Sequence, residues 1–190
     1  MRRWHKVAIV VIVSLAGGIG SAALAIRSVG MNAGVRNGCW GTNLAAGSQE
    51  ADMYTRAAIA IGGLFALDKR ETLYFNTFED DQGAPLRAQC DYVLAGRDLD
   101  ARWWSFTVYG EDHFLIPNEA KRYSYNLLNL ERKADRSYEI HLSSTAHEGN
   151  WLPTGTGRFS VTLRLYNPGS SVYQHPSTTD LPRITRGTCQ

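Results

Sequence analysis

Glu111-Asp112-His113 is the cluster in this sequence whose residue types could most readily do chemistry. Two carboxylates beside an imidazole can bind a metal ion, or can act as general acid and base. The same residues also fit a hydrated turn between two strands, since Gly110 directly precedes them, and we favour that interpretation. The functional alternative is a hydrolase or a metal-dependent carbohydrate-active enzyme that uses this cluster.

Sequence motifs with a known catalytic geometry do not occur elsewhere in the chain. There is no G-x-S-x-G, H-E-x-x-H, C-x-x-C or phosphate-binding loop. Ser124 and Ser143 have no histidine at a diagnostic spacing, and the spacing of His141 and His147 has no standard metal geometry. The sequence therefore predicts no catalytic residue, no metal site and no cofactor, although it leaves enzymatic activity open.

Aromatic and arginine side chains on expected strands suggest a binding surface instead. In residues 102–109, Trp104 faces the core and Trp103 faces outward, because side chains alternate along a strand. Exposed aromatic rings can bind sugars or other flat apolar surfaces. Alternatively, the tryptophans are covered by other segments, and the arginines only hold strand ends through forked hydrogen bonds. The candidate ligand-binding residues are Trp103, Tyr109, Arg122, Arg164 and Tyr166.

Alternating apolar and polar residues place most of the chain after residue 70 in short strands. Seven or eight such strands predict a mainly β protein, with an antiparallel β-sandwich or a jelly roll as its architecture. Residues 80–83 have the composition of a hairpin turn, residues 150–153 that of a structured loop, and residues 167–190 that of an irregular tail. The expected strands are 73–78, 86–94, 102–109, 114–116, 123–127, 138–142 and 161–166.

One amphipathic helix is expected before the strands, from about residue 49 to 66. Ser48 is a plausible N-cap, and acids come after it in the first turn, where they suit the helix dipole. Apolar residues then recur at helical spacing. They are Met53, Ala57, Ile61 and Leu64.

The N-terminal segment predicts a membrane anchor. Residues 7–26 carry no charge and are long enough to cross a bilayer as a helix. Arg2, Arg3 and Lys6 precede this run, which favours a cytoplasmic N-terminus and export of the chain beyond residue 27. A cleaved signal peptide, with an A-x-A-like end at 23–25, is the alternative and would also export the domain. The predicted organisation is a cytoplasmic segment (1–6), a transmembrane anchor (7–26), a linker with an ordered end near Trp40 (27–47) and a β-sandwich domain (48–190).

Charge argues against nucleic acid as a partner. Without the three bases before the apolar run, 17 Lys and Arg residues face 18 Asp and Glu residues. A nearly neutral domain lacks the basic surface that binding to phosphate backbones requires.

Three cysteines fit an exported chain, because an oxidising compartment allows disulfides to persist. We expect a bridge between Cys90 and Cys189, which would fix the C-terminal tail, and we assign no role to Cys39. Three free thiols are the alternative.

Several unusual sequence blocks, at 101–109, 122–124, 150–153 and 159–166, resemble the bacterial domain-of-unknown-function family numbered 1214. The resemblance covers residues 54–168. The family often forms the C-terminal half of larger proteins that begin with a related domain numbered 1254, whereas this chain looks like a short, single-domain, membrane-anchored version. The resemblance implies a jelly-roll-like β-sandwich and transfers no catalytic residues.

Taken together, the sequence predicts a single-pass protein of a bacterial inner membrane, anchored in the lipid bilayer through residues 7–26. Its β-sandwich domain is expected in the periplasm, where it would bind a glycan, a lipid-derived ligand or a protein of the cell envelope without catalysis.

Overall fold

The structure, a computed structural model, describes residues 3–30, 34–61 and 66–189, so Arg2 and Leu64 lie outside the described residues. The chain divides into two compact units, one of residues 1–33 and 45–66 and one of residues 34–44 and 67–190. The helices are α1 (Arg3–Ala25), which continues as a π-helical turn (Ile26–Gly30), α2 (Met53–Ile61), α3 (Ser170–Gln174) and a 3-10 turn (Pro176–Thr178). The strands are β1 (Val35–Asn37), β2 (Trp40–Thr42), β3 (Thr72–Thr77), β4 (Cys90–Gly96), β5 (Ala101–Gly110), β6 (Ser124–Asn126), β7 (Tyr138–Ser143), β8 (Trp151–Pro153), β9 (Phe159–Pro168) and β10 (Arg183–Cys189).

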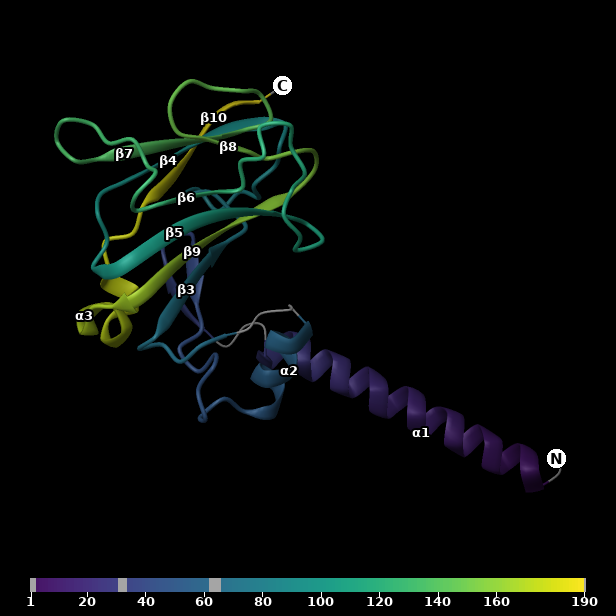
Figure 1. Cartoon of the computed structure of the whole chain (residues 1–190). Coiled ribbons are helices and arrows are strands. Elements are labelled where there is room, and N and C mark those ends of the chain that lie inside the picture. The colour runs from purple at the N-terminus through teal and green to yellow at the C-terminus, as the bar shows by residue number, and fades with distance from the viewer. Residues whose placement is uncertain (1–2, 31–33, 62–65, 190) are drawn as a thin grey trace. The chain divides into compact units, whose positions relative to one another are not determined.

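The strands of the second unit form two sheets (Figure 1). One sheet has six strands in the order β1-β2-β3-β9-β5-β6, and all its pairs are antiparallel. The other has four strands in the order β10-β4-β7-β8, and its last pair, β7 and β8, is parallel. The prediction of a mainly β protein is confirmed, but the four-stranded sheet is mixed and not purely antiparallel.

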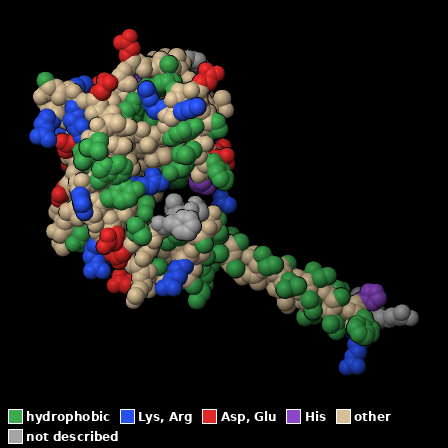
Figure 2. Space-filling view, in the orientation of Figure 1, with side chains coloured by type: hydrophobic (Ala, Val, Ile, Leu, Met, Phe, Trp, Pro, Cys, Tyr) green, Lys and Arg blue, Asp and Glu red, His purple; other side chains and the backbone are tan. Residues whose placement is uncertain are grey.

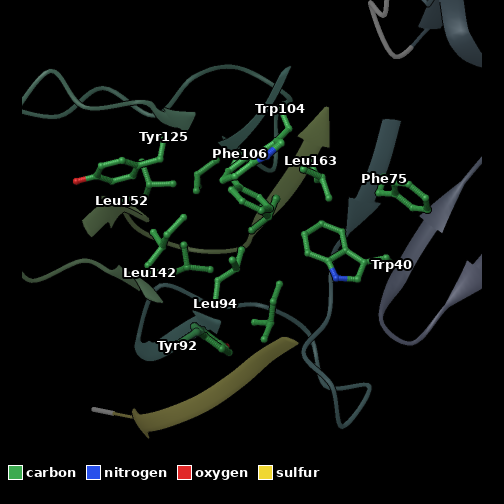
Figure 3. Packing of buried hydrophobic residues seen from close by; sticks show 14 of the residues in the cluster. Trp40, Phe75, Tyr92, Leu94, Trp104, Phe106, Tyr125, Leu142, Leu152 and Leu163 are labelled. Carbon is green, nitrogen blue, oxygen red and sulfur yellow. The ribbon is translucent and has the colours of Figure 1, made fainter. Parts of the chain in front are cut away.

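The inner faces of the two sheets share one hydrophobic core (Figure 3). Trp104 and Phe106 of β5 are fully buried, as alternation predicts, and so is Leu163 of β9. Leu142 contributes to the same cluster from the four-stranded sheet. The ring of Tyr138 on β7 lies 5.4 Å from that of Trp104, so the two sheets are in direct contact. Burying large aromatic side chains stabilises such an interface strongly, because each removes extensive apolar surface from water.

Helix α1 has the length and composition of a membrane-spanning helix, as the sequence predicts. Its residues are exposed along its length, and Figure 2 shows hydrophobic side chains along it with basic side chains near its N-terminal end. The helix runs through Gly17 and Gly18 without a break, although glycine weakens helices in water. One such helix near an N-terminus is also compatible with a signal sequence.

Helix α2 begins later than the sequence indicates. Asp52 caps it, because its carboxylate accepts hydrogen bonds from the backbone N–H groups of Tyr54 (2.8 Å) and Thr55 (3.0 Å). The predicted cap, Ser48, instead donates its hydroxyl to the carbonyl oxygen of Ala45 at 2.8 Å. Residues 62–65 of the predicted helix lie outside the described residues. Aspartate and serine are similarly good N-cap residues, so both Ser48 and Asp52 could have begun the helix, and the structure uses Asp52.

Five segments differ from the sequence prediction. The expected strand at 114–116 is absent, and Leu115 there forms only an isolated antiparallel bridge with Tyr109. Strands β1 and β2 lie in the stretch expected to be a linker, and Trp40 there is 2% exposed and donates its indole N–H to the carbonyl of Pro182. Strand β10 lies in the expected irregular tail, where Ile184 enters the core. Residues 150–153 contain β8 instead of a loop. The turn at 80–83 is present, but β3 and β4 on either side of it join different sheets.

Candidate functional site

Four of the five predicted ligand-binding residues lie together on the outer face of the six-stranded sheet. Trp103 of β5 is the cross-strand partner of Tyr166 of β9, and their rings meet edge to face with centroids 5.2 Å apart. Arg164 lies two residues from Tyr166 on the same face, and Tyr109 lies further along β5. All four side chains are partly exposed. We call these four residues the outer-face cluster.

Arg164 is held in a fixed position by its neighbours. Its guanidinium donates one hydrogen bond to the hydroxyl of Thr107 (3.1 Å) and one to the hydroxyl of Tyr109 (2.7 Å). The same guanidinium lies 5.5 Å from the centroid of the Tyr109 ring, in the range of a cation–π interaction. These contacts orient the arginine along the sheet and leave other N–H groups free to donate.

Small hydroxyl side chains line the sheet surface between the members of the outer-face cluster. Ser105, Thr107 and Thr162 point to the outer face, yet they are only 6–7% exposed. Thr162 donates its hydroxyl to the amide oxygen of Asn76 at 2.7 Å. The outer-face cluster thus combines apolar ring surface with one positive charge, and small hydroxyl side chains surround it. It contains no acid or histidine that could transfer a proton, so this arrangement is suited to binding.

Arg122, the fifth predicted residue, lies apart from the other four. It precedes β6, and its guanidinium is 5.8 Å from the ring centroids of both Tyr125 and Trp151. It also donates to the backbone carbonyl of Trp151 at 3.5 Å. Arg122 therefore bridges the edge strands β6 and β8, which belong to different sheets. The alternation of side chains along a strand could not predict this position of Arg122, because the residue lies just before β6.

The acid–histidine cluster lies in a tight turn after β5. Glu111, Asp112 and His113 are all exposed, and His113 has a left-handed backbone with φ of 64°. The Asp112 carboxylate accepts a hydrogen bond from the backbone N–H of Phe114 at 3.0 Å, so it stabilises the turn itself. Among the described residues, no three His, Cys, Asp or Glu side chains are grouped closely enough to hold a metal ion.

Two histidines meet on the outer side of the four-stranded sheet, which the sequence did not reveal. The rings of His141 and His147 are stacked, 4.7 Å between centroids and 3° from parallel. His141 is also beside Trp151 in the register of β7 and β8. Parallel stacked rings direct their nitrogen lone pairs side by side and not toward one point, which does not suit a shared metal ion. His147 reaches this position through a loop, and no periodicity predicts such a contact.

The cysteines are arranged as the sequence predicts. Cys90 of β4 and Cys189 of β10 form a disulfide across paired strands. Cys39 is buried, and burial raises the pKa of its thiol to about 12. An uncharged thiol at physiological pH is a poor nucleophile, so Cys39 is not suited to covalent chemistry.

Comparison with known proteins identifies relatives without an assigned activity. The family described as "Protein of unknown function (DUF1214)" matches residues 71–170. The crystal structure of the VPA0106 protein from Vibrio parahaemolyticus is similar, with a TM-score of 0.61 and 22% identity over 71% of this chain and 35% of that one. An uncharacterised protein from Burkholderia cenocepacia has a TM-score of 0.42 and 21% identity over 63% of this chain and 30% of that one. The chain thus spans about a third of the length of these two structures. The similarity to the Vibrio protein supports the fold described above. No curated protein matches the chain.

Proposed function

Because the chain belongs to the DUF1214 family, for which no activity is described, we propose a function from its own geometry. The protein is a membrane-anchored domain of the bacterial cell envelope, and it binds a glycan through the outer-face cluster without catalysing a reaction. Its sheets form a jelly-roll-like sandwich that faces the periplasm, and α1 holds it in the inner membrane.

Export is supported by α1 and by the disulfide. The basic residues Arg3 and Lys6 lie at the N-terminal end of α1, and bases on that side favour a cytoplasmic N-terminus. The Cys90–Cys189 bridge would persist in the periplasm, whereas cytoplasmic reductants keep most thiols reduced. Retention as an anchor is supported by the continuous helix, which is longer than the apolar region of a typical signal peptide.

The observation that carries the binding proposal is the composition of the outer-face cluster. Sugars present C–H faces that pack on aromatic rings and hydroxyl groups that need hydrogen-bond partners. Trp103 and Tyr166 provide adjacent partly exposed rings, and Arg164 is oriented with donor groups to spare. Ser105, the cross-strand partner of Arg164, and Thr107 add hydroxyl groups on the same face. An all-apolar ligand would leave the remaining donor groups of Arg164 without partners, which disfavours it.

Cosedimentation with purified peptidoglycan sacculi tests this proposal. The full chain in lipid nanodiscs should pellet with the sacculi, and Trp103→Ala and Arg164→Met should each reduce the bound fraction at least severalfold. Leu128→Ala is the matched control, because this residue is 84% exposed on a turn outside the cluster. Equal pelleting of all four proteins, or none by the unmodified chain, would show that the cluster does not bind this glycan.

A further inference from the structure

The outer-face cluster contains one charged side chain and no acid to balance it. Among the residues of β3, β5, β6 and β9 that share a face with Arg164, none is charged. The cross-strand neighbours of Arg164 are Tyr74 on β3 and Ser105 on β5. No carboxylate of the described residues forms an ion pair with its guanidinium. The middle of this face therefore carries an unbalanced positive charge.

The guanidinium of Arg164 is partly withdrawn from water. Arg164 is half-buried, and both groups that it donates to, the hydroxyls of Thr107 and Tyr109, are uncharged. Burying a charge without a partner of opposite charge costs free energy, because neutral acceptors replace the lost water only in part. By contrast, Arg132, whose side chain is 23% exposed, lies 2.8 Å from the carboxylate of Asp98. A ligand with a carboxylate would supply to Arg164 what Asp98 supplies to Arg132.

The contacts that hold Arg164 also prepare its remaining donor groups for a ligand. Thr107 accepts one N–H group and Tyr109 accepts another, and among the described residues the other N–H groups donate to no protein atom. A guanidinium that is fixed before binding loses little conformational entropy when a ligand arrives. Its planar fork matches the two oxygens of a carboxylate.

The charge of this face favours a carboxylate over a phosphate. A carboxylate carries one negative charge, which one guanidinium balances. A phosphate monoester carries about 1.5 to 2 negative charges at neutral pH, and the described strands offer no second basic residue on this face to balance them.

The ring pair and the charge lie at different places along the sheet. Tyr166, with its partner Trp103, is the next residue on this face after Arg164, about 7 Å along β9 at the usual rise of a strand. Arg164 reaches the other way, to Tyr109, which lies about 20 Å along β5 from Trp103. One sugar ring is too short to contact both ends of this site, whereas an oligosaccharide is long enough.

We propose that the outer-face cluster binds an acidic oligosaccharide, of which one sugar packs on Trp103 and Tyr166 while the carboxylate of another is held by Arg164. This inference rests on the proposed function, since it names the class of glycan bound at the same site. Uronic acids, in which the terminal hydroxymethyl group of a sugar is oxidised to a carboxylate, are the simplest ligands of this class. Their carboxylate adds a charge-assisted hydrogen bond to the packing of sugars on aromatic rings.

Biolayer interferometry with the full chain in lipid nanodiscs tests this inference, with empty nanodiscs as the blank. The immobilised probes are oligomers of glucuronate, galacturonate and mannuronate. Each is measured beside its carboxyl-reduced counterpart, in which a neutral hydroxymethyl group replaces the carboxylate. The unmodified chain should bind at least one acidic probe about tenfold or more tightly than the reduced counterpart, the effect of one charge-assisted hydrogen bond.

Substitutions at the two ends of the site should have different effects. Arg164→Gln should make the affinities for the acidic and the reduced probe about equal, whereas Trp103→Ala should weaken both and leave their ratio unchanged. Arg164→Lys keeps the charge but not the planar fork, so this ratio should fall about threefold; this variant decides the test if Arg164→Gln does not fold. Arg183→Gln is the matched control, because Arg183 is an exposed arginine on β10 of the other sheet, and it should change neither affinity.

Equal binding of acidic and reduced probes by the unmodified chain would overturn the inference and leave glycan binding by the cluster standing. An undiminished preference for the acidic probe in Arg164→Gln, or in Arg164→Lys where the glutamine variant does not fold, would also overturn it, because other charges would then hold the carboxylate. Binding of none of the probes would overturn it too. Absence of pelleting with sacculi in addition would overturn the proposed function with it.

Discussion

Asn150 gives the most precise test of how the fold is held together. It is 6% exposed, and its side-chain oxygen accepts a hydrogen bond from the backbone N–H of Glu131 at 2.8 Å. Its amide nitrogen donates to the carbonyl of Glu131 at 2.7 Å and to the carbonyl of Glu139 at 2.9 Å. One buried side chain therefore joins the loop before β7 to β7 itself, at the start of β8.

The substitution Asn150→Asp keeps the shape and the acceptor but removes both donors. The carbonyl oxygens of Glu131 and Glu139 then lose their partners and face a carboxylate oxygen at the same short distance. An unsatisfied buried group costs about 1–3 kcal/mol, and these two carbonyl groups are only partly buried, so we expect the free energy of unfolding to fall by about 2 kcal/mol at pH 7. The loss should shrink as the pH falls toward about 4, because a protonated carboxyl can donate one bond again.

Chemical denaturation of the detergent-solubilised full chain, followed by tryptophan fluorescence, measures this loss. Asn126→Asp is the matched control. Among the described residues, the Asn126 side chain donates no hydrogen bond and only accepts from the backbone N–H groups of Leu128 (2.9 Å) and Asn129 (3.3 Å). An aspartate accepts equally well, so this control should change stability by less than about 0.5 kcal/mol. Equal effects of the two substitutions would refute the reasoning that the lost donors cause the destabilisation.

Three further predictions concern the same unit. The Cys90–Cys189 bridge closes a loop with a sequence separation of 99. The loss of loop-closure entropy in the unfolded chain predicts that replacing both cysteines with alanine lowers the free energy of unfolding by up to about 4.7 kcal/mol, measured by denaturant titration. A loss below about 1 kcal/mol would contradict this prediction. Burial raises the pKa of the Cys39 thiol from 9.0 to about 12, so the unfolded chain loses this proton at a lower pH than the folded one. The free energy of unfolding is therefore unaffected by Cys39 below pH 9 and falls as the pH rises from 9 toward 12. In Cys39→Ala, the decrease of unfolding free energy with pH over this range should be smaller. The guanidinium of Arg186 lies 2.9 Å from the carboxylate of Asp80, which is 1% exposed. Arg186→Met leaves this buried carboxylate without its partner and should lower the free energy of unfolding by about 3 kcal/mol at pH 7, measured by thermal unfolding. An unchanged unfolding temperature would show that the pair contributes nothing to stability.

Sequence periodicity was sufficient to predict the longest strands. In β5 and β9, large apolar residues alternate with polar ones over ten positions each, and the predicted inner residues Phe106 and Leu163 are fully buried. The same alternation placed Trp103 and Arg164 on the outer face. Long strands with one buried face repeat the same signal several times, which is why they can be recognised.

Short and weakly apolar strands could not be predicted in this way. Strand β10 has one buried apolar residue, Ile184, and it is held by pairing with β4 and by the disulfide. Strands β1, β2 and β8 have three residues each, too few for a period to appear. Trp151 is half-buried beside Arg122 and donates its indole N–H to the carbonyl of Ser143. Such contacts depend on how distant segments meet, which local sequence does not encode.

The candidate sites were predictable to a similar extent. Alternation placed Trp103 and Tyr166 on outward faces, but their cross-strand pairing depends on the register of β5 and β9, which the sequence did not predict. The stacking of His141 on His147 depends on a loop conformation.

Export of the β-sheet unit is the claim on which the proposed function rests, and paired reporter fusions test it most directly. Alkaline phosphatase is active only after export, whereas green fluorescent protein exported through the same pathway stays dark. Each reporter is fused to the C-terminus of the full chain in a Gram-negative host, with a variant lacking residues 7–26 as the control. We predict an active phosphatase and a dark fluorescent fusion for the full chain, and the reverse for the control. An inactive phosphatase together with a fluorescent full-length fusion would contradict the account.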